Sequence, residues 1–226
     1  MGNKQSSHAF DPPPTPPSTG RFQYHIPTSW FLLPRQPTSL ANPLPTNHKR
    51  YREISGFFLK TLPSSYILSI QRVKNYEQYN LFAAKHEALS HNEGRPVALR
   101  MLFHGTQKTT PEAIIHSAAG FDPRWSHEGR WGLGAYFAVN ASYSDSYAHW
   151  ITGDPNGPKQ MFCAMVIIGE SIDLSPNNAL RMPPPRPGKQ GRCYDSVKGK
   201  TGGSEVYITY ETNTAYPSFL ITYSPN

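Results

Sequence analysis

The residues of this chain that are best suited to binding or catalysis lie in two short stretches about thirty residues apart. In chain order, the polar and aromatic side chains and the glycine concerned are His104, Gly105, Thr106, Tyr136, Ser144 and Tyr147. Glycine allows a close approach to the backbone, and aromatic rings with one well-placed hydroxyl commonly bind flat heterocycles. Taken alone, His104 would be read as a core histidine and the tyrosines as half-buried strand or helix residues.

The neighbouring sequence changes that interpretation, because several blocks share the order and spacing of one known family. They are Phe58-x-Lys60-Thr61, Leu102-Phe103-His104-Gly105-Thr106, Gly132-Leu133-Gly134-Ala135-Tyr136-Phe137-Ala138, Val139-Asn140-Ala141-Ser142-Tyr143-Ser144 and Ala215-Tyr216-Pro217-x-Phe219-Leu220-Ile221-Thr222-Tyr223. From about Ile54 to its last residues, the chain resembles the catalytic domain of the poly-ADP-ribose-polymerase-like (diphtheria-toxin-like) ADP-ribosyltransferases. It is most similar to their mono-ADP-ribosylating, macrodomain-associated members.

The first stretch would hold the adenosine side of NAD and part of the nicotinamide. The resemblance implies that His104 hydrogen-bonds the 2′-hydroxyl of the adenosine ribose. The backbone of Gly105 would pair with the nicotinamide carboxamide, where a side chain would leave no room for a flat ligand. Thr106 would add a hydroxyl near the adenosine ribose.

The second stretch would form the nicotinamide pocket. The resemblance implies that Tyr136 lines this pocket, that Tyr147 stacks on the ring and that Ser144 hydrogen-bonds the carboxamide oxygen. For Tyr143, between them, we prefer the plainer interpretation of a half-buried structural residue.

The reaction that the resemblance implies needs little acid catalysis. Nicotinamide is already cationic in NAD and leaves as a neutral group, so the transition state is similar to an oxocarbenium ion. The enzyme has to hold the dinucleotide in a fixed orientation and to stabilise the developing charge.

The third catalytic position decides the length of the product. Polymerising members carry a glutamate there, in a strand similar to Ser204-Glu205-Val206-Tyr207-Ile208-Thr209-Tyr210. Counting back without a gap from Ala215-Tyr216-Pro217 places Val206 at this position. Strand side chains alternate between faces, so Glu205 should point away from the site unless a bulge intervenes. The expected catalytic set is therefore His104, Tyr136 and Val206.

Two features near the site leave questions open. Residues 122–131 should form the loop that covers the donor, and the sequence does not show which of its large side chains close over NAD; the candidates are Arg124, Trp125, Arg130 and Trp131. Leu133 stands where the family usually has lysine, a departure that also suits a catalytically silent binding module.

Composition argues against several other features, such as a nucleic-acid partner, a membrane span and a metal site. The net charge is +7, but the basic residues are scattered, so we expect a solvated basic surface without a nucleic-acid partner. The chain has no run of about eighteen apolar residues. Its two cysteines, Cys163 and Cys193, suggest reduced thiols. They are too few for an ordinary zinc site, and no metal is expected. We expect a monomer in the cytoplasm or the nucleus.

The first part of the chain differs from the rest. Residues 1–50 contain ten of the 23 prolines and cannot bury enough apolar surface to order themselves, so a disordered leader is expected there, with the catalytic domain over residues 51–226. Phe22, Tyr24, Trp30 and Phe31 would either bind a partner or cover the domain. Met1-Gly2-Asn3-Lys4-Gln5-Ser6 fits the pattern for myristoylation of Gly2, which would give weak, reversible membrane association.

The pattern of elements predicts an α+β domain built from two packed, mostly antiparallel sheets around an NAD cleft, with flanking helices. One or two helices are expected over residues 66–89. A short helix should begin at Pro111 with Thr110 as its N-cap. Strands are expected over residues 97–103, 161–168, 206–210 and 219–223.

These observations predict a mono-ADP-ribosyltransferase that transfers ADP-ribose from NAD to a protein acceptor. Two alternative functions, from other classes of protein, remain. Leu133 and Val206 also suit a catalytically silent module that binds NAD or ADP-ribose. The proline-rich leader and Gly2 suit a membrane-tethered interaction protein.

Overall fold

A computed structural model describes residues 38–225 of the chain, except residues 108 and 155. The helices of the described part are α1 (Lys49–Leu59), α2 (Tyr76–Glu93), α3 (Pro111–His116), a 3-10 helix (Pro123–Trp125) and α4 (Ala141–Asp145). The strands are β1 (Ser39–Leu40), β2 (Tyr66–Lys74), β3 (Leu99–His104), β4 (Ala135–Ala138), β5 (His149–Trp150), β6 (Lys159–Ile167), β7 (Ser171–Asp173), β8 (Ser196–Thr201), β9 (Ser204–Thr209) and β10 (Ala215–Ser224).

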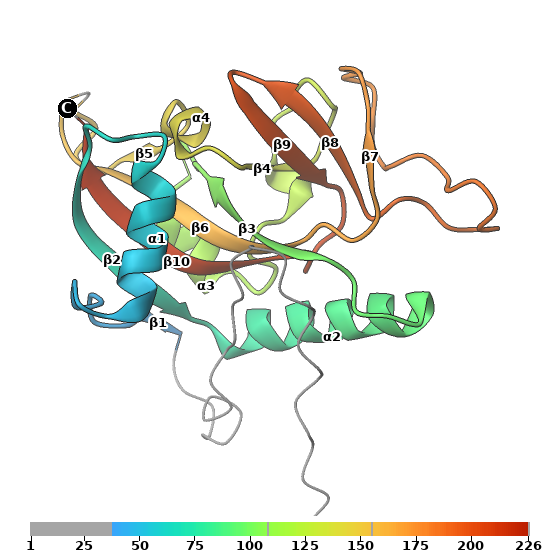
Figure 1. The fold of residues 1–226 in the computed structure, drawn as a ribbon, viewed down its shortest axis with the longest axis horizontal. Helices are drawn as coiled ribbons and strands as arrows, with labels where there is room; N and C mark the ends of the chain where they lie inside the picture. The colour runs from blue at the N-terminus through green and yellow to red at the C-terminus, as the bar shows by residue number, and fades with distance from the viewer. Residues whose placement is uncertain (1–37, 108, 155, 226) are drawn as a thin grey trace, which may run out of the picture.

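The strands are hydrogen-bonded in one path with the order β1-β2-β10-β6-β3-β4-β9-β8-β7, and β5 pairs with β6 beside it (Figure 1). All described pairs are antiparallel except β7 with β8. The join between β3 and β4 consists of a single pair, Phe103 with Ala138. The α+β class and the mostly antiparallel pairing are confirmed, while the two expected sheets are the two halves of one sheet, joined at this pair.

The prediction of helix over residues 66–89 is wrong for its first part. β2 pairs with β10 along most of its length, and a register shift between Thr222 and Tyr223 lets apolar residues at irregular spacing pack. The helix α2 begins only at Tyr76, because the side chain of Asn75 accepts a hydrogen bond from the backbone N–H of Gln78 (3.0 Å) and caps it. Spacing alone did not distinguish a bulged strand from a helix.

The other predicted elements agree with the structure. The helix α3 begins at Pro111, and the hydroxyl of Thr110 accepts a hydrogen bond from the N–H of Ala113 (3.4 Å) as its N-cap. The four predicted strands correspond to β3, β6, β9 and β10, the last of which is longer than expected. The pairing of Phe103 with Ala138 places the ends of β3 and β4 next to each other, although about thirty residues separate the two strands in the chain.

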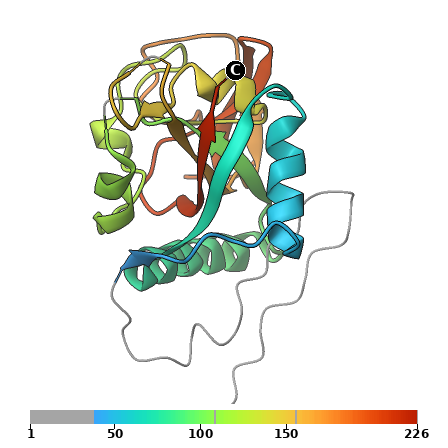
Figure 2. The ribbon, with the colours of Figure 1, turned by 90° about the vertical axis from the view of Figure 1, so that its left-hand side faces the viewer.

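Three groups of buried side chains hold the fold together. The first packs α1 and α2 on one face of the sheet through Ile54, Phe58 and Phe82. The second covers the opposite face with Ile115 of α3 and Phe121. Figure 2 shows α1 and α3 on opposite sides of the strands. The third lies between β4, β8 and β9, and contains Trp131, Ala138, Val197, Val206 and Ile208.

The start of the described chain differs from the predicted boundary. β1 pairs with the end of β2, so Ser39 and Leu40 belong to the sheet although the sequence assigned them to the leader. Gly2 and the aromatic residues at positions 22–31 lie outside the described residues. Among the helices that the structure describes, none combines the length and the apolar composition that crossing a membrane requires.

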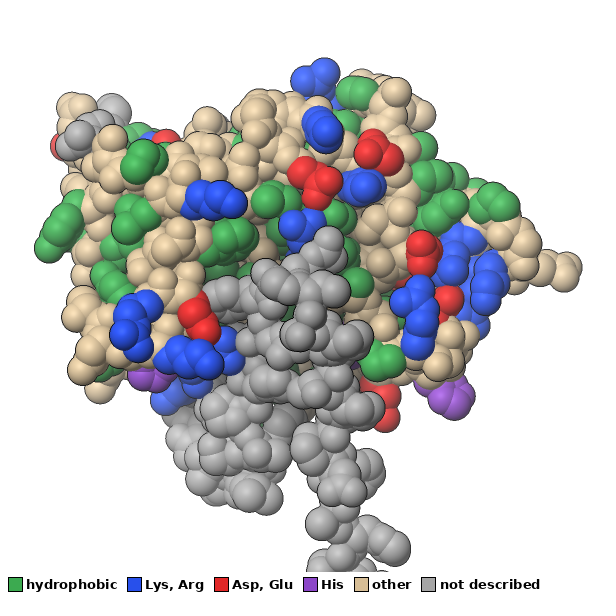
Figure 3. Space-filling view, viewed as in Figure 1, with side chains coloured by type: hydrophobic (Ala, Val, Ile, Leu, Met, Phe, Trp, Pro, Cys, Tyr) green, Lys and Arg blue, Asp and Glu red, His purple; other side chains and the backbone are tan. Residues whose placement is uncertain are grey.

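Basic side chains are spread over the visible surface in several groups, with acidic side chains between them (Figure 3). Part of this mixture is explained by ion pairs, such as Arg95 with Glu170 (3.1 Å) and Arg181 with Glu128 (2.7 Å). Both cysteines are free thiols, and burial raises the pKa of Cys163 on β6.

Candidate functional site

His104 is the last residue of β3, at the point where the two halves of the sheet separate. Its Nδ1 lies 2.7 Å from the backbone oxygen of Tyr136. Because a carbonyl only accepts, Nδ1 carries the hydrogen and donates it, and Nε2 of the neutral ring is left as an acceptor. Burial lowers the pKa of His104, and the hydrogen bond to Tyr136 opposes this only in part. Phe121 and Phe137, with ring centroids 4.8 and 5.2 Å away, fix the imidazole further.

Gly105 brings β3 against the segment that follows α4. A Cβ atom at this position would lie 2.4 Å from the carbonyl of Tyr147 and 2.5 Å from the backbone oxygen of Ser144. The N–H of Gln107 donates to the Tyr147 carbonyl (2.7 Å) and closes this contact. The sequence explained the glycine by the approach of a ligand. The structure adds a reason within the protein, because any side chain would push the two segments apart.

The hydroxyl of Thr106 forms a hydrogen bond within its own loop. Its Oγ1 donates to the backbone oxygen of Thr109 (2.6 Å). Its remaining hydrogen-bonding capacity is therefore as an acceptor, which limits what it can offer to a ribose hydroxyl.

Tyr136 lies on β4, and its hydroxyl is anchored to the turn that precedes the strand. It donates to the backbone oxygen of Gly132 (2.9 Å) and accepts from the N–H of Trp131 (2.9 Å). Burial is the main reason that the pKa of Tyr136 rises to about 12, so the phenol is neutral at physiological pH. The hydroxyl is thus occupied by the protein, and a ligand would meet mainly the ring.

The short helix α4 supplies Ser144 and leads into Tyr147. Ser144 is buried, whereas the side chain of Tyr147 is 40% exposed. Asp145, the last residue of α4, anchors the helix by accepting hydrogen bonds from Lys159 (3.0 Å) and from the hydroxyl of Tyr223 (2.5 Å). Ser144 and Tyr147 therefore stand on a rigid support beside Gly105.

Val206 lies on β9 directly opposite Ala138 of β4, and no register shift interrupts this pairing. Its side chain is fully buried in the cluster that Tyr136 and Tyr143 border. Glu205 projects from the opposite face, where its carboxylate accepts hydrogen bonds from Arg100 and Tyr207 (both 2.9 Å). Burial raises the pKa of Glu205, but these two hydrogen bonds together with the positive charges of Arg100 and Lys198 outweigh it, so the net shift is downward.

The loop over residues 122–131 divides into core and surface residues. Trp131 is buried, donates from Nε1 to the backbone oxygen of Leu174 (2.8 Å) and packs so closely on Gly199 that a Cβ there would lie 2.0 Å from its ring. It cannot close over a ligand, so this candidate was wrong. Trp125 is 85% exposed, and Arg124 is paired with Asp122 (2.5 Å). The two halves of the loop therefore differ in their freedom to cover a donor.

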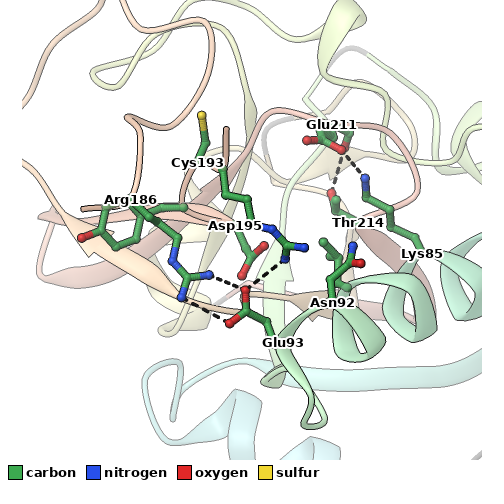
Figure 4. A pocket seen from close by; sticks show the side chains of 11 residues that line it. Lys85, Asn92, Glu93, Arg186, Cys193, Asp195, Glu211 and Thr214 are labelled. Atoms are coloured by element: carbon green, nitrogen blue, oxygen red, sulfur yellow. Dashed lines mark hydrogen bonds and ion pairs between the residues drawn. The ribbon is translucent and has the colours of Figure 1, made fainter. Parts of the chain in front are cut away.

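A concave region lies away from these residues, between the end of α2, residues 186–195 and the segment that follows β9 (Figure 4). It encloses about 210 Å³ and is lined by three basic and three acidic side chains: Lys85, Arg186, Arg192, Glu93, Asp195 and Glu211. Figure 4 shows Arg186 turned toward Glu93, at 2.7 and 3.3 Å, and Lys85 turned toward Glu211. None of the predicted site residues lines it.

No sequence pattern predicted this charged pocket. Glu93 and Arg186 are 93 positions apart, and neither belongs to a recognisable motif. Within the part of the chain that the structure describes, no group of three or more His, Cys, Asp or Glu residues is arranged to hold a metal ion.

Comparison with known proteins identifies the family of the chain. The family model of the poly(ADP-ribose) polymerase catalytic domain matches residues 48–202. The chain belongs to this family, and the resemblance read from its motifs is confirmed.

Individual relatives carry more specific names. The chain is 32% identical over 205 residues to a probable poly [ADP-ribose] polymerase of Dictyostelium discoideum, covering 87% of this chain and 57% of that protein. It is 31% identical over 218 residues to protein mono-ADP-ribosyltransferase PARP11 of Homo sapiens, covering 88% and 63%. To PARP12 of Mus musculus, also named a protein mono-ADP-ribosyltransferase, it is 28% identical over 182 residues, covering 80% and 25%. The chain thus spans less than two thirds of the length of each of these relatives.

Proposed function

We propose that this protein is a mono-ADP-ribosyltransferase that transfers ADP-ribose from NAD to a protein acceptor and releases nicotinamide. The observation that carries the proposal is the meeting of His104, Gly105, Tyr136 and Tyr147 at the junction of β3, β4 and α4. These residues come from separate parts of the chain. The family to which the chain belongs supports the same proposal.

The chemistry of the site suits a donor whose leaving group departs neutral. The neutral His104 offers Nε2 as an acceptor for a ribose hydroxyl, and Nδ1 is held by the Tyr136 carbonyl so that the ring keeps this orientation. Tyr147 presents an exposed ring for stacking on nicotinamide, and Ser144 beside it supplies a hydroxyl for the carboxamide. Each of these groups binds and orients, and none has to donate a proton to the leaving group.

Transfer of a single ADP-ribose is proposed because of Val206. Polymer growth in the family relies on a carboxylate at this position, and an apolar side chain there cannot orient the hydroxyl of an incoming ribose. Glu205 is engaged with Arg100 on the opposite face of the strand and offers no substitute. The names of the relatives do not decide the point, since one is a probable poly [ADP-ribose] polymerase and others are mono-ADP-ribosyltransferases.

A silent module that binds NAD or ADP-ribose is the second candidate. It is favoured by Leu133, which replaces the usual lysine of the Gly-x-Gly block, and by the uncharged Val206. One experiment separates the two. The binding of NAD to the purified protein is measured by calorimetry. The protein is then incubated with NAD, and its intact mass is recorded. A gain of one ADP-ribosyl group on the protein or on an added acceptor supports the enzyme, binding without any gain supports the module, and no binding contradicts both.

The proposal extends to cellular location. We infer a monomer in the cytoplasm or the nucleus, and a partly membrane-associated population because Gly2 lies in a myristoylation pattern. One acyl chain gives only marginal membrane affinity, so fractionation of eukaryotic cells should find the protein divided between membrane and soluble fractions. Gly2→Ala should move it to the soluble fraction. Equal distribution of both forms, with an unmodified N-terminus by mass spectrometry, would reject the anchor.

A further inference from the structure

Tyr143, which the sequence suggested to be only structural, stands next to the exposed ring of Tyr147. Their ring centroids are 5.4 Å apart with planes inclined by 48°. The two residues are four positions apart at α4 and its end, which places them as neighbours on one side of that segment. Tyr143 is half-buried and borders the cluster that contains Val206. One side of the Tyr147 ring is therefore supported by protein, while 40% of the side chain remains open.

The turn between β8 and β9 also lies against the ring of Tyr143. A Cβ atom at Gly202 would lie 2.6 Å from Cδ2 of the Tyr143 ring. The turn is fixed to the start of α4 by Asn140, whose side chain donates to the backbone oxygen of Gly203 (2.9 Å) and whose N–H donates to the hydroxyl of Ser204 (3.0 Å). Tyr143 thus contacts both this turn and the ring of Tyr147.

The loop before β4 also contacts the end of β8, next to this turn. Arg130, in the loop before β4, donates from Nη1 to the hydroxyl of Thr201 at the end of β8 (3.2 Å). Burial is the main cause that raises the pKa of Tyr143; the hydroxyl of Tyr147 raises it further and that of Thr201 lowers it.

We propose that Tyr143 is a positioning residue that orders the ring of Tyr147 for stacking on nicotinamide, and that the β8–β9 turn holds Tyr143 in place through Gly202. This rests on the proposed function, since it assigns Tyr147 to the nicotinamide. An exposed aromatic side chain loses rotational freedom when it stacks on a ligand. Tyr143 removes part of that freedom before NAD arrives, so its contribution appears in NAD binding more than in the chemical step.

The test uses two changes that disturb the contact in different ways. Tyr143→Leu removes the ring that supports Tyr147, and Gly202→Ala adds a methyl group against that ring. Both should weaken NAD binding and raise KM by about 2- to 10-fold while changing kcat less. Tyr143→Phe keeps the ring and should restore binding close to that of the wild type.

Gly203→Ala is the matched control for Gly202→Ala. Both glycines have positive φ, +52° and +73°, so both substitutions carry backbone strain. A Cβ at Gly203 meets nothing within 4 Å, so only the change at Gly202 should move Tyr143. Equal effects of the two alanines on KM, or NAD binding that is unchanged in Tyr143→Leu, would overturn the proposal.

A measurement without NAD separates this inference from the proposed function. Nitration of tyrosines by tetranitromethane, mapped by peptide mass, should be faster at Tyr147 in Tyr143→Leu and Gly202→Ala than in the wild type or Gly203→Ala. If the wild type does not bind NAD, the proposed function is wrong, and the nitration rates still decide whether Tyr143 orders Tyr147. Identical rates in all four proteins would contradict that ordering.

Discussion

The site around His104 and the charged pocket around Glu93 satisfy their polar groups in different ways. At the site, His104 and Tyr136 are neutral, and backbone groups bind their polar atoms. In the pocket, charged side chains neutralise one another across long sequence distances, as Glu93 does with Arg186 and Arg192. A pocket in which most charged side chains are already paired offers little to a ligand, whereas neutral groups with one free acceptor and one open ring can still bind.

The two regions also differ in what holds them in shape. The site depends on close backbone packing, above all at Gly105, and tolerates no added atom there. The pocket depends on side-chain ion pairs that tie residues 186–192 to the end of α2. A change at the site should therefore affect function first, and a change in the pocket should affect stability first.

Gly105→Ala should have the largest effect. Its methyl group would lie 2.4 Å from the Tyr147 carbonyl, so β3 and the end of α4 must separate. We expect NAD binding and transfer to fall below detection and overpacking to cost about 1–3 kcal/mol of unfolding free energy. Gly56→Ala, inside α1 with nothing within 4 Å of the new atom, is the control and should stabilise the protein by roughly 1 kcal/mol. Normal NAD titration by the Gly105 variant would show that this contact does not shape the site.

His104→Ala should weaken NAD binding without abolishing the fold. Loss of one hydrogen bond of about 0.5–1.5 kcal/mol corresponds to a roughly 2- to 12-fold rise in Kd by calorimetry. Because burial lowers the pKa of His104 below its ordinary value of 6.5, wild-type affinity should stay constant from about pH 6.5 to 8. The unfolded chain takes up the proton more readily, so the histidine's contribution to stability is complete above pH 6.5 and is lost as the pH falls below it. A marked change in affinity between pH 7 and 8 would contradict this assignment.

Glu93→Gln should reverse the pattern by lowering stability while leaving NAD binding unchanged. It removes the charge that pairs with Arg186, and the side chains of this pair are only 10% and 11% exposed. Hydrogen bonding from Arg186 is the main cause that lowers the pKa of Glu93, so its contribution is present above pH 4.5 and is lost as the pH falls below that value. Glu211→Gln is the control, because that carboxylate is 68% exposed and its pair with Lys85 should contribute little. Melting temperatures and calorimetry on both variants test the comparison, which fails if Glu93→Gln weakens NAD binding without lowering the melting temperature.

The sequence predicted the site better than the pocket for physical reasons. The strands that carry His104 and Tyr136 are short apolar runs bounded by glycines, and their motifs have fixed spacing. The error over β2 arose because a bulged strand and a helix can share apolar spacing. Trp131 could not be recognised as a core residue, because its burial depends on Gly199 and Leu174, which fold against it from far along the chain. The Glu93 pairs were invisible for the same reason.

The smallest effect is expected from Glu205→Gln, which tests the register that separates Val206 from its neighbour. Glu205 lies on the face away from Tyr136 and binds Arg100 and Tyr207, so its charge should not take part in transfer. Wild type and Glu205→Gln should both add single ADP-ribosyl groups, even at high NAD, by intact mass. Val206→Glu places a carboxylate in a fully buried apolar cluster, where its desolvation should destabilise the protein without producing polymer. Ladders of ADP-ribose from the wild type that disappear in Glu205→Gln would show that Glu205 turns toward the donor during the reaction, and the assignment of mono-transfer to Val206 would then be wrong.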